Sequence, residues 1–437
     1  MQTRQPRIVI VGGGFAGVNA AQRLARRMKG SADIVLVSDS TMHTFTPWLY
    51  EIASGNANVH VRSAHRALAK SADVPIAAAL LRCDGRVRFR HATVTGLDLD
   101  HRHVLLAGGH TLQFDALIIA LGSEVAYFGI PGMRECALPL KTSANAAAIH
   151  RRVRELVQAT NERERKSVHV LIGGAGPIGV ELAGELATMA RGLAKRGQLP
   201  HGTLRITLID AVSRVLSMTP PKVSLAAERR LRSLGVEVML DTMVIEAHKD
   251  GVVVRPRPQG ADDTAPSRSP YAAATRIDAD LVVWAGGVKP NGVLEQFAVP
   301  KDPRGRIRVT PTFEVYGHPH VFALGDCALL IDPATNQPVP QTAHAAEYAA
   351  PRVADNVIRA LAHRPLQPVA LPKRWPLVVT VGGRYGVANM WGLACKGWIA
   401  YALRRAADFR YFWHTLPHGL ALRTWWRGVA LYRDNDG

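Results

Sequence analysis

Two glycine-rich segments carry the spacing that binds the pyrophosphate of a dinucleotide. The first is Gly12-Gly13-Gly14-Phe15-Ala16-Gly17, and the second has its glycines at Gly174, Gly176 and Gly179. The first glycine of such a pattern permits a tight turn, the second lets the backbone approach the phosphates, and the third lets a helix pack closely on a strand. Unpaired amides at the helix N-terminus then favour negative charge. We therefore expect two dinucleotide sites in one chain.

Carboxylates stand where the adenosine ribose of each dinucleotide is expected. Asp210 ends the apolar run 204–210 of the second unit. A carboxylate there can accept hydrogen bonds from both ribose hydroxyls, which favours NADH over its 2′-phosphate; a solvated strand-end charge is the alternative. In the first unit either Ser38 or Asp39 faces the ribose, and the pattern leaves that choice open.

The segments that must position these residues predict two βαβ units. Apolar runs at 8–11 and 168–172 precede the glycines, an alanine-rich helix follows each, and further apolar strands come next. A chain of 437 residues also exceeds the roughly 250 residues at which single cores stop growing. We expect an α/β fold of two Rossmann-like domains with parallel sheets. The expected boundaries are 1–145 with 290–370 for the first domain, 146–289 for the second and 371–437 for a third segment.

Composition narrows the class of protein. Apolar residues make up 47% of the chain, which excludes wholesale disorder. We expect neither a spanning helix nor a signal peptide, because no run of about 18 apolar residues and no cleavage site occur. Cysteines at positions 83, 136, 327 and 395 are too far apart for a CxxC pair, so we expect a reducing compartment and no metal site.

The net charge of +19 would draw the protein toward anionic surfaces, although Arg-rich codon usage could explain part of it. We do not expect nucleic-acid binding, because no recognised motif supports it.

The third segment is rich in aromatic residues and predicts a membrane-surface helix. It holds 12 of the 27 aromatic residues of the chain and has ten Lys and Arg against three Asp. At 100° per residue, one arc contains Trp391, Cys395, Trp398, Ile399, Ala402, Ala406, Phe409 and Trp413. Lys396, Arg404 and Asp408 fall elsewhere. Such an amphipathic stripe suits the anionic headgroup layer; a homodimer interface or a core helix is the alternative.

Further motifs point to a family. They are His43-Thr44-Phe45-Thr46-Pro47-Trp48-Leu49-Tyr50, Trp284-Ala285-Gly286-Gly287-Val288 and Gly325-Asp326-Cys327-Ala328. With the second glycine segment, they resemble the type II NADH:quinone oxidoreductases among the two-dinucleotide-binding flavoprotein reductases, over nearly the whole chain. The resemblance implies FAD in the first domain, NADH in the second and electron transfer to a membrane quinone without proton pumping. It also implies a cytoplasmic enzyme, peripheral on the inner face of the cell membrane.

The same resemblance assigns roles to single residues. It implies that Asp326 binds the flavin ribityl chain, that the Val94 backbone lies near the adenine, and that Glu181 lies near nicotinamide and flavin. Glu181 could instead be a helix-face charge, and Gly286 and Gly287, which would let the nicotinamide lie against backbone, could simply form a turn. The remaining FAD-binding positions are Gly122, Gly325 and Ala343. We interpret Cys327 as a buried packing residue.

The acceptor site departs from the family pattern. Its motif Ala-Gln-x-Ala-x-Gln-Gln is matched at Ala343 and Ala346, whereas the glutamine positions hold His344, Tyr348 and Ala349. His344 could hydrogen-bond a quinone or deliver a proton to it, or it could pack in the pocket wall. A soluble NAD(P)H-dependent reductase with a different acceptor is therefore the alternative function.

Overall fold

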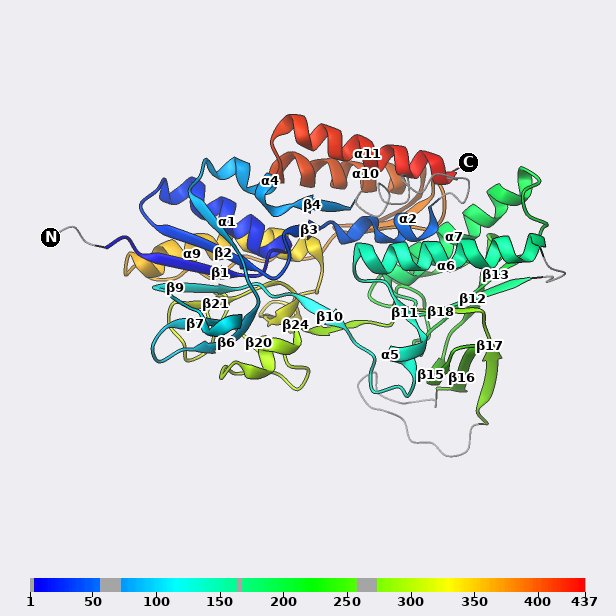
Figure 1. Cartoon of the computed structure of the whole chain (residues 1–437), viewed down its shortest axis with the longest axis horizontal. Helices are drawn as coiled ribbons and strands as arrows, with labels where there is room; N and C mark the ends of the chain where they lie inside the picture. The colour runs from blue at the N-terminus through cyan, green and yellow to red at the C-terminus, as the bar shows by residue number, and fades with distance from the viewer. Residues whose placement is uncertain (1–3, 56–71, 163–166, 258–272, 437) are drawn as a thin grey trace.

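Two five-stranded parallel sheets form the two lobes of the protein (Figure 1). The computed structural model describes residues 4–55, 72–162, 167–257 and 273–436. The first sheet has the order β21-β9-β1-β2-β5, with β1 (Arg7–Val11), β2 (Asp33–Ser38), β5 (Val87–His91), β9 (Ala116–Ile119) and β21 (Val321–Ala323). The second has the order β11-β18-β12-β13-β14, with β11 (Leu138–Pro139), β12 (Val168–Gly173), β13 (Leu204–Ile209), β14 (Glu237–Met239) and β18 (Leu281–Trp284). The predicted α/β class with parallel sheets is confirmed.

Helices cover both sheets. Strands that are buried on two faces consist of continuous apolar residues. Residues 8–11 of β1 are fully buried. The helices are α1 (Phe15–Met28), α2 (Leu49–Ser54), α4 (Ile76–Leu80), α5 (Met133–Cys136), α6 (Ser143–Glu162), α7 (Pro177–Lys195), α8 (Pro221–Ser233) and α9 (Ala343–Leu361).

Three antiparallel strands complete each lobe. They are β6 (Val94–Asp98), β7 (His103–Leu106) and β8 (Thr111–Gln113) in the first lobe, and β15 (Thr242–His248), β16 (Gly251–Pro256) and β17 (Thr275–Asp278) in the second. Between the lobes, β10 (Ser123–Val125) pairs with β19 (Val288–Pro290), as Figure 1 shows. The short pairs are β3 (Met42–Thr44) with β4 (Asp73–Pro75), β20 (Ile307–Arg308) with β22 (Ala328–Leu329), and β23 (Ile331–Asp332) with β24 (Gln337–Pro338).

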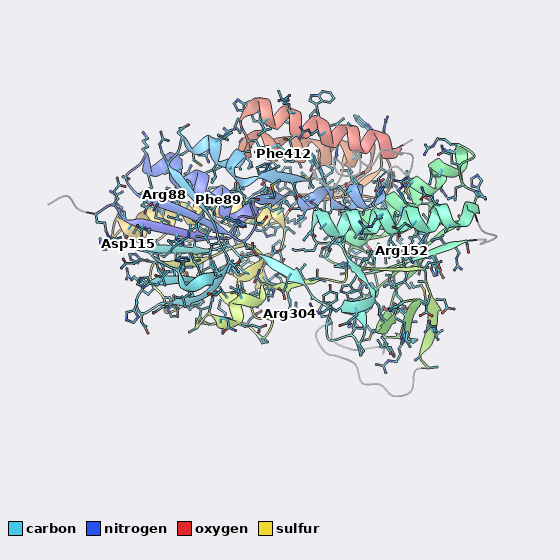
Figure 2. All side chains as sticks on the ribbon, in the orientation of Figure 1. Arg88, Phe89, Asp115, Arg152, Arg304 and Phe412 are labelled. Carbon is cyan, nitrogen blue, oxygen red and sulfur yellow. The ribbon has the colours of Figure 1, made fainter. Side chains whose placement is uncertain are left out.

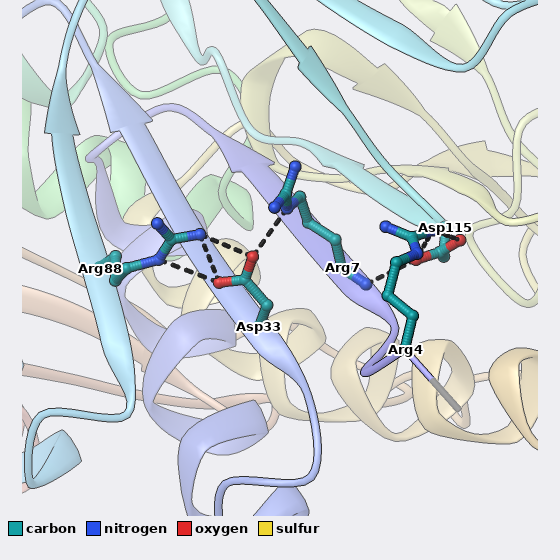
Figure 3. A network of polar contacts seen from close by, with 5 residues as sticks. All are labelled: Arg4, Arg7, Asp33, Arg88 and Asp115. Carbon is teal, nitrogen blue, oxygen red and sulfur yellow. Dashed lines mark hydrogen bonds and ion pairs between the residues drawn. The ribbon is translucent and has the colours of Figure 1, made fainter. Parts of the chain in front are cut away.

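An ion network joins residues at the amino ends of three neighbouring strands of the first sheet (Figure 3). Asp33 accepts hydrogen bonds from Arg7 at 2.7 Å and from Arg88 at 2.6 Å. Burial disfavours the charged carboxylate, but these hydrogen bonds hold the pKa of Asp33 below its ordinary value. The network fixes the amino-terminal edge of the first sheet, while the first glycine loop leaves from the opposite, carboxyl edge, where ligands of such sheets bind.

The third segment is only partly helical. It forms an antiparallel sheet of β25 (Leu377–Thr380), β26 (Gly386–Met390) and β27 (Leu393–Gly397), followed by α10 (Trp398–Thr415) and α11 (His418–Asp436). The prediction of one helix beginning at Trp391 is therefore wrong. Trp391 and Gly392 form the β26–β27 turn with φ angles of +52° and +100°, and Cys395 lies in β27. Figure 1 shows α10 and α11 side by side along one edge of both lobes.

On α10, the start of the predicted stripe is exposed, whereas a charge outside the stripe is buried. Trp398 and Ile399 in the stripe are 67% and 60% exposed, and Asp408 outside it is 3% exposed. Tyr411 and Phe412 belong to the main core, and Phe412 is labelled in Figure 2. The C-terminal segment is thus part of the packed molecule. Among the described residues, no helix has the length and apolarity needed to cross a bilayer.

Candidate active site

The first glycine loop connects β1 to α1 and has the stereochemistry of a phosphate-binding turn. Gly12 has a φ of +113°, and a Cβ there would lie 2.1 Å from the carbonyl oxygen of Ala120. A Cβ on Gly17 would lie 1.9 Å from the carbonyl oxygen of Gly12, whereas the same position on Gly14 faces open space. The first and third glycines are therefore required by packing, and the second leaves room for a ligand.

The second loop, between β12 and α7, repeats this arrangement. Gly174 has a φ of +112°, and its Cβ would lie 2.4 Å from the carbonyl oxygen of Ala285. Gly179 approaches the Gly174 carbonyl so closely that a Cβ would lie 1.8 Å from it, and Gly176 faces open space. Two loops of the same geometry thus begin two helices.

A cavity of about 410 Å³ lies at the carboxyl edge of the first sheet. Its wall contains twelve of the residues that the sequence analysis assigned to the first site, namely Gly12, Gly13, Gly14, Phe15, Ala16, Ser38, Asp39, Val94, Gly122, Gly325, Asp326 and Ala343. Gly17 lies beneath the loop, where it packs against Gly12. The structure therefore brings residues far apart in the sequence to one concave surface.

Asp326 is held by Ser123, which is in turn held by Lys141, and sequence reasoning missed both residues. The Ser123 hydroxyl donates to Asp326 Oδ2 at 2.6 Å, and Lys141 Nζ donates to the same hydroxyl at 2.8 Å. Burial lowers the pKa of Lys141, and the Asp326 carboxylate opposes that shift. Ser123 directly follows Gly122 and could have been found from that position, whereas no local signal marks Lys141.

Ser38 and Asp39 occupy different positions at the end of β2. Ser38 is buried, and its Oγ lies 2.9 Å from where a Cβ of Gly13 would be, so this hydroxyl packs beneath the loop. Asp39 is exposed at the cavity wall.

In the second lobe, Asp210 follows β13 and faces the second glycine loop. Its carboxylate accepts the Ala175 amide at 2.6 Å and the Val212 amide at 3.2 Å. A Cβ on Gly286 would lie 2.3 Å from the Trp284 indole, which by itself requires glycine there. Gly287 adopts a φ of +147°.

Glu181 is a buried member of α7 that reaches the C-terminal segment. Its carboxylate lies 3.6 Å from the guanidinium of Arg404, which also contacts Asp408 at 3.4 Å. Burial raises the pKa of Glu181 to about 7, with Arg404 opposing the shift and Asp408 adding to it. The alternative of a solvated helix-face charge is therefore wrong, and Arg404 is a neighbour of Glu181 that the sequence analysis did not predict.

The same segment also reaches the first cavity, at a point that the sequence analysis missed. The Tyr411 hydroxyl lies 2.6 Å from Nε2 of His43, whose Nδ1 lies 3.2 Å from the Gly13 carbonyl oxygen. Because a carbonyl can only accept, Nδ1 carries the proton and Nε2 accepts from the tyrosine. Burial lowers the pKa of His43 to about 4, so this ring is neutral.

The start of α9 forms the remaining wall of the cavity. Thr342 caps the helix by accepting the Ala345 amide at 3.2 Å, and Thr342, Ala343 and Ala346 line the cavity. His344 is not among the lining residues; its ring makes an edge contact with Trp375 at 6.1 Å. Burial lowers the pKa of His344, and Arg410 adds to this effect.

Cys327 packs inside the protein. Its Sγ lies 3.3 Å from the Leu324 carbonyl oxygen, and burial raises the pKa of the thiol to about 11.

Comparison with known proteins agrees with this architecture. Residues 6–350 match the model of the pyridine nucleotide-disulphide oxidoreductase family. The chain is 32% identical to the type II NADH:quinone oxidoreductase Ndh of Mycobacterium tuberculosis over 374 residues, which cover 82% of this chain and 73% of that one. It is 30% identical to the demethylphylloquinone reductase NdbB of Synechocystis over 436 residues, covering 98% and 96% of the two chains.

A solved structure has the same fold. NDH2 from Plasmodium falciparum, determined in complex with NADH, superposes with a TM-score of 0.78 at 17% identity, covering 99% of this chain and 98% of that one. The resemblance seen in the sequence is confirmed. This chain belongs to the pyridine nucleotide-disulphide oxidoreductase family and, within it, to the type II NADH:quinone oxidoreductases.

Proposed function

We propose that this protein transfers electrons from NADH through FAD to a membrane quinone, without moving protons across the membrane. The observation that carries the proposal is the pair of glycine loops with the same geometry, in a chain 30–32% identical to two quinone reductases. In the proposed division of labour, 1–145 with 290–370 hold FAD, 146–289 hold NADH, and 371–437 attach the enzyme to the membrane.

The first cavity suits FAD. Open space at Gly14 leaves room for a pyrophosphate at the N-terminus of α1, where the helix dipole favours negative charge. Asp326, oriented by Ser123, can accept a hydrogen bond from a ribityl hydroxyl. The exposed Asp39 is better placed than the packed Ser38 to bind the ribose. FAD, when bound, accepts a hydride from the nicotinamide and passes two electrons onward.

The second loop suits NADH. Asp210 already holds the Ala175 amide of the loop, so the same carboxylate can orient the loop and accept the ribose hydroxyls. A 2′-phosphate would be repelled by this charge. Glu181 is the carboxyl group that we assign to the nicotinamide end, where its protonated form can donate a hydrogen bond at neutral pH.

The third segment suits the cytoplasmic surface of an anionic membrane. Trp391 and Leu393 at the β26–β27 turn are 68% and 78% exposed, and Trp398 and Ile399 at the start of α10 are exposed as well. The same segment, 371–437, contains ten Lys and Arg, and Lys396 between the turn and α10 is exposed. Aromatic side chains flanked by basic ones favour the headgroup layer, so we assign the surface to lipid and treat a second copy of the chain as the competing occupant.

Steady-state assays with the purified, flavin-containing enzyme test this function. We expect oxidation of NADH with a short-chain benzoquinone or naphthoquinone, and kcat/KM for NADH at least about tenfold above that for NADPH, equivalent to about 1.4 kcal/mol. Asp210→Ala should narrow that preference, while Asp278→Ala, an exposed carboxylate outside the loop, should leave it unchanged. An enzyme that reduces ferricyanide or ferredoxin but no quinone would favour the soluble reductase instead.

A further inference from the structure

A second buried carboxylate lies between α9 and α10, away from Glu181. Glu347 is one turn beyond His344 on α9, and its side chain is only 14% exposed. Arg410 of α10 donates to its Oε2 at 2.9 Å, and the Arg410 side chain is 50% exposed. One end of this ion pair is therefore inside the protein and the other reaches solvent.

Glu347 lies beside the wall of the first cavity. Its helix neighbours Ala343 and Ala346 line that cavity, as does Phe15, whose ring lies 5.1 Å from that of Tyr411. Burial is the largest cause that raises the pKa of Tyr411, and the charge of Glu347 is the second. The two groups are therefore close. The carboxyl group thus stands at the junction of the flavin cavity and the C-terminal segment.

The surroundings of Glu347 raise its pKa into the neutral range. Burial raises the pKa of Glu347 to about 7; Arg410 opposes this shift and Asp408 adds to it. On α1, the helix packed along α9, Arg23 is paired with Asp355, two turns further along α9. A group whose pKa is near 7 can both release and regain a proton under working conditions.

His344 is less suited to that role. Burial lowers its pKa, with Arg410 contributing, so the imidazole is neutral at pH 7. A neutral imidazole can orient an acceptor by a hydrogen bond but carries no proton that it releases easily. The two residues, three positions apart on one helix face, can therefore divide orientation and proton delivery.

We propose that Glu347 delivers the proton that completes quinol formation. The inference rests on the proposed function. Reduction of a quinone to a quinol needs two electrons and two protons. NADH supplies a hydride, which accounts for both electrons and one proton. The O–H bond of Glu347 breaks as the second quinol O–H bond forms. Arg410 stabilises the resulting carboxylate, which regains a proton from solvent along this half-exposed side chain.

Glu347→Gln tests the assignment in the holoenzyme. In the wild type, kcat for the quinone should fall about tenfold per pH unit above about pH 7, because the protonated donor is lost. At pH 6.5, kcat of Glu347→Gln should be about a hundredfold below that of the wild type, and it should no longer depend on pH in this way. Glu347→Asp should keep it, and Glu155→Gln, a change at an exposed helix carboxylate, should behave as wild type.

Two readouts separate a chemical role from a structural one. Flavin content and the rate at which NADH bleaches the flavin should be unchanged in Glu347→Gln. The infrared band of a carboxylic acid that titrates near pH 7 should decrease in this variant. A wild type that reduces no quinone would refute the proposed function. A quinone-active wild type whose Glu347→Gln variant keeps both the pH profile and the infrared band would overturn this inference alone.

Discussion

Helices α9 and α10 differ in the charge that they bury and in the apolar side chains that they expose. Toward the first domain, α9 buries mainly small apolar side chains, with Val353 and Val357 fully buried. The buried face of α10 contains Asp408, contacted by Arg404 at 3.4 Å, Arg405 at 2.7 Å and the Trp48 indole at 2.9 Å. The outer face of α10, by contrast, exposes Trp398 and Ile399.

This difference indicates which environment the outer face of each helix requires. Burial of a large apolar side chain contributes about 1.5–3 kcal/mol, so α9 is stable with its polar face in water. Because α10 leaves such side chains outside, its outer face requires a non-aqueous partner for the same gain. The inner charges, which must be paired to be tolerated in the interior, fix the angle at which α10 presents that face.

The largest effect is expected from the buried carboxylate of α10. Asp408→Ala should lower the free energy of unfolding by about 3 kcal/mol or more, because Arg404 and Arg405 lose their contacts with this carboxylate inside the protein. Urea denaturation of the holoenzyme measures this. Glu155→Ala, at an exposed helix carboxylate, should change it by less than about 0.5 kcal/mol. Equal small losses would mean that the inner face of α10 is solvated.

The exposed face should matter for lipid and not for folding. A Trp398→Ala and Ile399→Ala double variant should bind vesicles of phosphatidylglycerol and phosphatidylcholine at least about tenfold more weakly, with unchanged stability. Met218→Ala, which removes an exposed apolar side chain from the second lobe, is the matched control. Salt should weaken wild-type binding without abolishing it. Unchanged vesicle binding, together with a shift from dimer to monomer, would assign this face to a second copy.

The smallest effect concerns the contact between α10 and the first glycine loop. Tyr411→Phe should reduce stability by about 1 kcal/mol, because the buried Nε2 of His43 loses its donor. Thermal unfolding of the holoenzyme is the measurement, with Tyr316→Phe, an exposed tyrosine, as control. If both variants unfold at the same temperature as the wild type, the inner face of α10 does not support the loop.

The parts of the site that follow from local chemistry could be predicted. A glycine loop between a strand and a helix needs particular backbone angles and close approaches at Gly12 and Gly174. A few neighbouring residues are therefore enough to predict this geometry. The pairing of Lys141 with Ser123, or of Glu347 with Arg410, joins positions distant in sequence. No periodicity reports such contacts.

The C-terminal segment could not be read correctly for a different reason. The stripe from Trp391 to Trp413 fits a helical period by coincidence, because the Trp391-Gly392 turn and β27 precede the true helix. The helical period also gives no sign that Arg404 and Asp408, which lie outside the stripe, are buried. Only the position of Glu181 and Trp48 beneath α10 explains why charges are buried there.

An anaerobic two-step mixing experiment tests the proposed electron path most directly. We expect NADH to bleach the flavin absorbance of the purified protein and a naphthoquinone added afterwards to restore it fully. Absence of bleaching, or bleached flavin that persists in excess quinone while ferricyanide reoxidises it, would contradict electron transfer from NADH to quinone.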